Sequence, residues 1–231
     1  MGQKKLVRFA AIKTFGNVLE YPEGMKGKWH ERFGNNNPIT LELACGKGEY
    51  SIGLGREHKD RNFIGVDIKG NRIYIGAKKA LAEGLSNVGF LRIQIQQLPE
   101  YFAQNEVDEL WIIFPDPFLS KAKNRLTHPR FLREYQKVLK PGGRIHLKTD
   151  SPELYAFTKE TVAELGCTVH ADIADIYGKG LATGPLAIQT FYEGMHLAEG
   201  RTIYYISFSL PENAIIVPAK KQKEDREDAA D

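Results

Sequence analysis

Four carboxylates in this 231-residue chain stand within or just after segments that predict strands: Glu42, Asp67, Asp116 and Asp150. In an open α/β sheet, ligands bind outside the carboxyl ends of the strands, so acidic side chains placed there are candidates for binding or catalysis. Such carboxylates can accept hydrogen bonds from sugar hydroxyls or stabilise positive charge that develops during a reaction. The types and positions of these residues therefore indicate ligand chemistry at one edge of a sheet.

Asp116 follows a run of five apolar residues, 110–114, and lies between Pro115 and Pro117. The apolar run predicts a strand that is buried on both faces, as in a parallel sheet. Each proline fixes its own φ and favours an extended conformation in the residue before it, so a stiff turn holds Asp116 just beyond the strand. A carboxylate that only ends a loop is the alternative interpretation of this residue.

A second short apolar segment, 39–44, runs directly into Cys45-Gly46-Lys47-Gly48-Glu49. The glycines Gly46 and Gly48 let the backbone approach a ligand closely before a helix begins near Glu49. Asp67 ends the next predicted strand about 20 residues beyond this loop, which is the spacing at which an acidic residue binds a ribose. The loop and Asp67 together predict a ligand that contains a nucleoside.

The loop suits a cationic nucleoside better than a dinucleotide. A third glycine of the dinucleotide pattern would fall at Ser51, and Glu42 before the loop would repel a pyrophosphate. S-adenosylmethionine carries a sulfonium and an ammonium group but no phosphate, so Glu42 and Asp67 match its chemistry. We therefore favour this methyl donor over NAD, while Glu42 as a simple strand-edge charge remains the alternative.

The elements that must position these residues form a doubly wound, mostly parallel α/β sheet. Strand patterns alternate with helical patterns, and Gly200 leads tightly into a long last strand, which suggests an antiparallel pairing. We predict helices over 71–84, 98–104, 127–139 and 151–165, and strands over 39–44, 62–67, 88–95, 110–114, 144–150, 167–175 and 202–210.

The chain divides into three expected parts. Residues 1–37 mix basic and aromatic side chains without a clear period and predict an arm with a short helix near 25–33. Residues 38–211 form the methyltransferase domain, and residues 212–231 form a charged, disordered tail rich in acidic residues.

The overall composition is that of an ordinary soluble globular chain, with 42% hydrophobic and 26% charged residues. No apolar run is long enough to span a membrane and the N-terminus has no signal-peptide core, so we expect a cytoplasmic protein. Two cysteines are too few for a disulfide framework or a zinc site. A basic group after the Pro-Asp-Pro turn is compatible with a polyanionic substrate: Lys121, Lys123, Arg125, Arg130 and Arg133.

These segments resemble the tRNA (guanine-N7)-methyltransferase family of the bacterial single-subunit type, over about residues 40–206. The glycine loop is common to many methyltransferases, whereas Phe-Pro-Asp-Pro followed by Lys-Thr-Asp and Thr-x-Tyr-Glu is far more specific. Ala44, Gln94 and Phe118 depart from the usual glycine, aspartate and tryptophan, and the basic loop after Pro117 is shorter than usual. The matching segments are 42–49, 62–69, 114–117, 125–132, 148–150 and 190–193.

The resemblance implies the Rossmann-like fold of class I S-adenosylmethionine-dependent methyltransferases, and methyl transfer to guanine N7 in the variable-loop region of tRNA. It implies no metal and no membrane, with a monomer or homodimer as the assembly. The implied donor-binding residues are Glu42, Gly46, Gly48, Asp67, Gln94 and Asp116, and Asp116 is also the implied catalytic residue. The implied tRNA-binding residues are Lys121, Asp150, Thr190, Tyr192 and Glu193.

Guanine N7 carries a lone pair and no proton, so methyl transfer to it requires positioning rather than a general base. A carboxylate near the ring would stabilise the positive charge that the ring acquires and accept its N–H donors; Asp116, Asp150 and Glu193 are the candidates. Phe118 and Tyr192 are candidates for stacking on the base, although either suits a packing role. Two alternatives stay open: a methyltransferase of this fold that acts on a protein or small molecule, and a non-catalytic RNA-binding partner.

Overall fold

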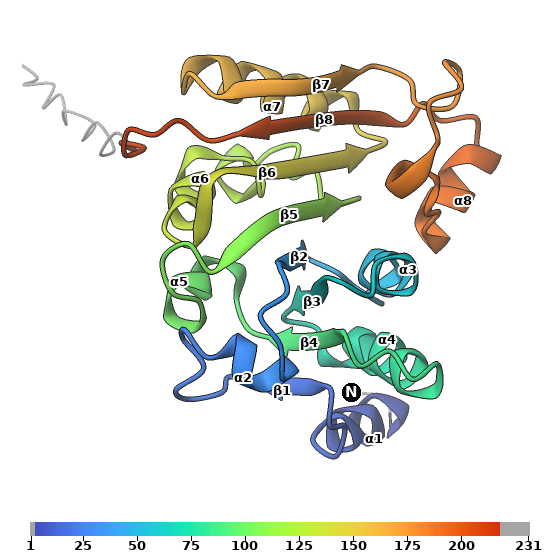
Figure 1. Ribbon diagram of the computed structural model, residues 1–231. Coiled ribbons are helices and arrows are strands. Elements are labelled where there is room, and N and C mark those ends of the chain that lie inside the picture. The colour runs from blue at the N-terminus through green and yellow to red at the C-terminus, as the bar shows by residue number, and fades with distance from the viewer. Residues whose placement is uncertain (1–2, 218–231) are drawn as a thin grey trace, which may run out of the picture.

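The computed structural model describes residues 3–217, and these residues form one eight-stranded sheet with helices on both faces (Figure 1). The strand order is β1-β4-β3-β2-β5-β6-β8-β7. All neighbouring pairs are parallel except those of β8, which runs antiparallel between β6 and β7. The strands are β1 Val18–Glu20, β2 Ile39–Leu43, β3 Asn62–Asp67, β4 Val88–Arg92, β5 Val107–Ile113, β6 Leu139–Thr149, β7 Thr168–Ile173 and β8 Tyr204–Ser209.

The helices connect these strands in the alternation that the sequence predicts. Helix α6 begins where Pro129 follows the capping residue His128, and α7 begins where Ser151 accepts a hydrogen bond from the Leu154 amide. None of the helices within residues 3–217 is long and apolar enough to cross a membrane. The α-helices are α1 Gln3–Ile12, α2 Trp29–Phe33, α3 Glu49–Glu57, α4 Gly70–Ala82, α5 Leu98–Tyr101, α6 Pro129–Gln136, α7 Pro152–Glu164 and α8 Phe191–Ala198.

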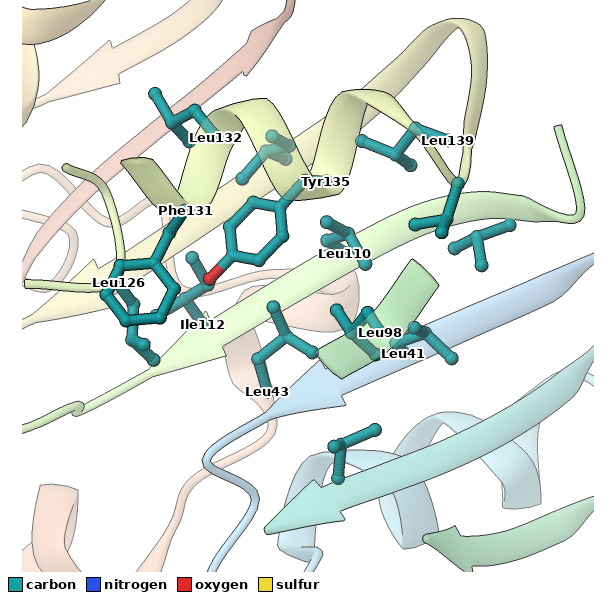
Figure 2. Close-up of a cluster of buried hydrophobic side chains, with 14 of the residues drawn as sticks. Leu41, Leu43, Leu98, Leu110, Ile112, Leu126, Phe131, Leu132, Tyr135 and Leu139 are labelled. Carbon is teal, nitrogen blue, oxygen red and sulfur yellow. The ribbon is translucent and has the colours of Figure 1, made fainter. Parts of the chain in front are cut away.

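The central strands are buried on both faces, as the apolar run at 110–114 predicts. Leu110 and Ile112 face one side and pack with Tyr135 of α6 and Leu98 of α5, as Figure 2 shows. Trp111 and Ile113 face the other side and join a second core beneath α1, α3 and α4. This alternation places each residue of 110–113 in one of the two cores, which explains why β5 has no polar side chain after Glu109.

The N-terminal segment is more structured than its sequence pattern suggests. Helix α2 confirms the short helix expected near 25–33, but α1 and the edge strand β1 have no counterpart in the expected elements. The three-residue β1 pairs with β4, and Trp29 of α2 is buried against Phe102 at a ring-centroid distance of 4.9 Å. Residues before position 38 therefore complete both the sheet and its core.

Part of the expected C-terminal tail also packs on the sheet. Ile215 is buried, and its amide donates to the Gln136 Oε1 atom at 2.9 Å. The remainder of the expected tail, residues 218–231, lies outside the described residues.

Candidate active site

A cavity of about 400 Å³ opens at the carboxyl ends of the central strands. The sheet order reverses between β2 and β5, because β3 and β4 follow β2 on one side while β5 and β6 continue on the other. This switch point is where open α/β sheets bind their ligands. The lining residues come from the ends of β2 through β5 and from the segment that leads into α6: Ala44, Asp67, Ile68, Lys69, Arg72, Ile93, Gln94, Ile95, Gln96, Phe114, Pro115, Asp116, Phe118, Asn124, Leu126, Arg130 and Phe131.

The glycine loop turns sharply beside this cavity. Gly46 and Gly48 have φ values of 56° and 64°, a conformation that favours glycine, and a Cβ atom added to Gly48 would lie 2.3 Å from the Phe90 ring. A Cβ atom on Gly46 would meet nothing within 4 Å, so the backbone there faces open space. Ala44 has a φ of 55°, which explains physically why glycine suits this position better than alanine.

Asp67 fixes the glycine loop by accepting hydrogen bonds from backbone amides. One carboxylate oxygen accepts the Gly46 amide and the other accepts the Lys69 amide, each at 2.8 Å. Each carboxylate oxygen can accept a further hydrogen bond, because it has more than one lone pair. Asp67 therefore joins the glycine loop to the cavity and keeps capacity for ligand hydroxyls; that it binds a ribose stays a prediction.

Gln94 and a set of isoleucines form the wall beyond Asp67. Gln94 is exposed, lines the cavity through its position after β4, and accepts a hydrogen bond from the Gln96 side-chain amide. Ile68, which is 39% exposed, and Ile95 supply apolar surface beside it. An apolar slot with one amide at its edge suits a planar heterocycle.

Asp116 enters the cavity from a strained turn at the end of β5. Phe114 and Phe118 bracket it with φ values of 45° and 41°, which are unusual for bulky side chains. The Phe114 amide donates to the Lys148 carbonyl at 2.9 Å, which anchors the start of the turn to β6. Asp116 itself is exposed on the cavity wall, and Phe118 lines the same wall with 36% of its surface exposed.

Glu42 lies beneath the glycine loop rather than on the cavity wall. It is 4% exposed, and one carboxylate oxygen accepts the Ser51 amide at 2.7 Å and the Ser51 hydroxyl at 2.6 Å. Burial raises the pKa of Glu42 to about 7, although the hydrogen bonds from Ser51 oppose that shift. Ser51 stands where the dinucleotide-binding pattern would have its third glycine, and it is the residue that donates both hydrogen bonds to Glu42.

Cationic side chains surround the cavity mouth. Lys69 and Arg72 line it on the β3 side, and Arg130 lines it on the α6 side. Lys121 is exposed in the adjoining segment 120–124, which forms its own shallow hollow. Of these residues, sequence reasoning did not single out Lys69 and Arg72. Their position shortly after Asp67, the carboxylate predicted to bind a ribose, is the signal that could have found them.

The other four residues predicted to bind tRNA lie on or beside α8, and they differ in exposure. Tyr192 is 44% exposed, whereas Glu193 is fully buried and its Oε1 atom lies 2.5 Å from the Lys148 ammonium. Thr190 caps α8 by accepting the Glu193 amide at 3.1 Å. Asp150 accepts a hydrogen bond from Arg201 at 2.8 Å. A direct contact between Glu193 and a substrate would therefore require its pair with Lys148 to open.

Comparisons with known proteins show what the chain is similar to in sequence. Residues 36–205 match a family model described as "Putative methyltransferase". The tRNA (guanine-N(7)-)-methyltransferase of Porphyromonas gingivalis is 50% identical over 213 residues, which cover 87% of this chain and 87% of that protein. The enzyme of the same name from Bacteroides thetaiotaomicron is 44% identical over 225 residues, covering 94% and 89%.

Solved structures of lower identity share the fold. The 16S rRNA methyltransferase KamB superposes with a TM-score of 0.63 at 16% identity, over 84% of this chain and 99% of that chain. This likeness confirms the doubly wound methyltransferase fold that the strand and helix pattern predicts. With the sequence relatives above, it leads to one conclusion: the chain belongs to the tRNA (guanine-N7)-methyltransferase family.

Proposed function

We propose that this protein transfers a methyl group from S-adenosylmethionine to N7 of a guanine in the variable-loop region of tRNA. The observation that carries the proposal is the cavity at the switch point between β2 and β5, where Asp67, Gln94 and Asp116 meet in a chain of this family. Its setting is the cytoplasm, where tRNA is modified.

The residues at the cavity fit the methyl donor. The free capacity of Asp67 suits ribose hydroxyls, and the slot between Ile68 and Ile95 with Gln94 at its edge suits adenine. The open space at Gly46 lets the methionine portion of S-adenosylmethionine approach the backbone closely. When bound, S-adenosylmethionine supplies an electrophilic methyl carbon.

Asp116 is the residue that acts on the guanine in this proposal. Its turn, fixed by Pro115 and Pro117 and anchored to β6, holds the carboxylate at the cavity mouth without a large reorganisation cost. There it accepts the N–H donors of the guanine edge and stabilises the positive charge that the ring gains. No proton has to leave N7, so the task of the protein is orientation.

The cations around the mouth suit the phosphates of a folded RNA. Lys69, Arg72 and Arg130 line the cavity although the donor has no phosphate, which favours a polyanionic second substrate. A structured guanine must leave its stack to enter the cavity, and Phe118 on the wall offers a surface for the extruded base.

Transfer of labelled methyl from S-adenosylmethionine to bulk tRNA that lacks N7-methylguanine tests this proposal. Reduction and aniline treatment should then cleave the labelled tRNA at the modified guanine, and mapping should place the cleavage in the variable loop. Label on another base, or on added protein but not on tRNA, would contradict it. Donor binding without any transfer would instead favour the non-catalytic RNA-binding role.

A further inference from the structure

A fully buried ion pair lies between β6 and α8, and neither of its residues lines the cavity. Lys148, near the end of β6, and Glu193, in the first turn of α8, are both 0% exposed, and the Nζ and Oε1 atoms are 2.5 Å apart. Burial lowers the pKa of Lys148, and the Glu193 carboxylate opposes that shift. A buried pair is often no more stabilising than an apolar pair of the same size, so its presence here calls for another role.

The Lys148 ammonium binds several segments at once. It donates to the carbonyls of Leu186 at 3.0 Å and Ile188 at 3.3 Å, and to the Tyr50 hydroxyl at 3.2 Å. Leu186 and Ile188 belong to the segment that leads into α8, whereas Tyr50 is in the first turn of α3 after the glycine loop. One side chain from the sheet therefore connects the first turn of α3, directly after the glycine loop, to the segment before α8.

Glu193 completes the connection on the helix side. Its Oε1 atom also accepts the Tyr177 hydroxyl at 2.8 Å, and its Oε2 atom accepts the Thr190 amide at 3.3 Å. Both carboxylate oxygens are thus occupied by protein donors. This arrangement is that of an internal brace, and it leaves the neighbouring Tyr192 exposed on the outer face.

The start of α8 also contacts the donor loop directly. The Phe191 amide donates to the Glu49 carboxylate at 3.2 Å, and the Lys47 ammonium lies 4.3 Å from the centroid of the Phe191 ring. Figure 1 shows α8 beside α3 at the carboxyl ends of the central strands. Two sets of contacts therefore fix the orientation of α8: the ion pair of Glu193 with Lys148, and the contacts of Phe191 with Lys47 and Glu49 of the glycine loop.

We propose that Lys148 is a positioning residue that acts through Glu193. It fixes α8 against the glycine loop so that the exposed side chains of α8 can contact the tRNA. The inference rests on the proposed function, since it assigns α8 to the tRNA side of that same reaction. Glu193 then acts through its pair with Lys148 and does not itself read the guanine.

A double-mutant cycle in tRNA methylation distinguishes two roles for Glu193: holding α8 through its pair with Lys148, or contacting the guanine directly. Lys148→Met and Glu193→Gln should each raise the KM for tRNA about tenfold, with the donor Kd changed less than about threefold. The double variant should be no worse than Lys148→Met alone, because it leaves no unpaired buried carboxylate. Effects that multiply in the double variant would overturn the proposal, as would a tRNA KM that stays at the wild-type value. Lys137→Met, which changes an exposed lysine on the α6 side, is the matched control.

Hydrogen exchange of the free protein gives a second readout that does not depend on activity. Glu193→Gln should speed exchange of the amides of 184–194 while the amides of β2 and β5 keep their protection. A loss of stability without a positioning role would instead speed exchange throughout or leave 184–194 unchanged, and either result would overturn the proposal. If the wild-type protein methylates no tRNA, the proposed function fails, and the exchange measurement still decides whether the brace exists.

Discussion

At the scale of single residues, two aromatic side chains in left-handed conformation bracket Asp116. Positive φ values at Phe114 and Phe118 cost about 1–3 kcal/mol each, so the surrounding structure must hold them in place. The hydrogen bond from the Phe114 amide to Lys148 and the two prolines provide that restraint. Strain of this kind is concentrated at functional positions, which supports the role of Asp116 proposed above.

Glu42 should make the free energy of unfolding depend on pH. Its pKa is raised from 4.5 to about 7 by burial, so between these values the folded state holds a proton that the unfolded state has lost. The free energy of unfolding should therefore fall as pH rises through this interval, by about 3 kcal/mol in total from this residue. Urea unfolding at a series of pH values measures the effect.

Glu42→Gln should remove this part of the pH dependence because the amide does not titrate. Glu160→Gln, on the exposed face of α7, is the control and should keep the wild-type slope. Equal slopes for Glu42→Gln and the wild type between pH 5 and 7 would show that Glu42 does not titrate as its burial requires.

At the scale of elements, the strands and helices around the site could be predicted because their patterns are strong. The double burial of 110–114 and the capping residues before α6 and α7 appear in the sequence as an apolar run and as His-Pro and Ser-Pro pairs. Strand β1 could not be predicted, since three residues give no period. The sequence also does not show which carboxylates already have partners within the protein. Only the fold shows that Ser51 donates hydrogen bonds to Glu42 and that Lys148 forms an ion pair with Glu193.

The basic segment 120–124 should govern affinity for tRNA. Changing both Lys121 and Lys123 to Met should raise the KM for tRNA several-fold with little effect on the donor, because exposed lysines contribute phosphate contacts. The slope of log affinity against log salt should fall by about 1 for each lysine.

The double change Lys137→Met with Lys140→Met is the control for charge alone. These exposed lysines pair with Glu134 and Asp108 at the amino-terminal edge of the sheet, away from the cavity. A salt slope that falls equally in both double variants would contradict a specific role for segment 120–124.

At the scale of the whole molecule, the first 37 residues contribute to the same structure as the rest. Trp29 is 2% exposed, donates from Nε1 to the Tyr101 carbonyl at 2.9 Å and belongs to the core that supports β2 and β5. Trp29→Ala should therefore lower the free energy of unfolding by about 3–5 kcal/mol in urea denaturation. Ile216→Ala, at a side chain that is 83% exposed, should change it by less than about 0.5 kcal/mol. A small effect at Trp29 would mean that the N-terminal segment packs only loosely on the sheet.

The most direct test of the account is the single-turnover rate of methyl transfer to tRNA by Asp116→Ala, at saturating donor and saturating tRNA. The role proposed for Asp116 is to stabilise charge on the guanine from a fixed turn, so the rate should fall by about 10²–10³ while circular dichroism stays that of the wild type. A rate within about threefold of the wild type would contradict a catalytic role for Asp116, and with it the assignment of this cavity as the site of methyl transfer.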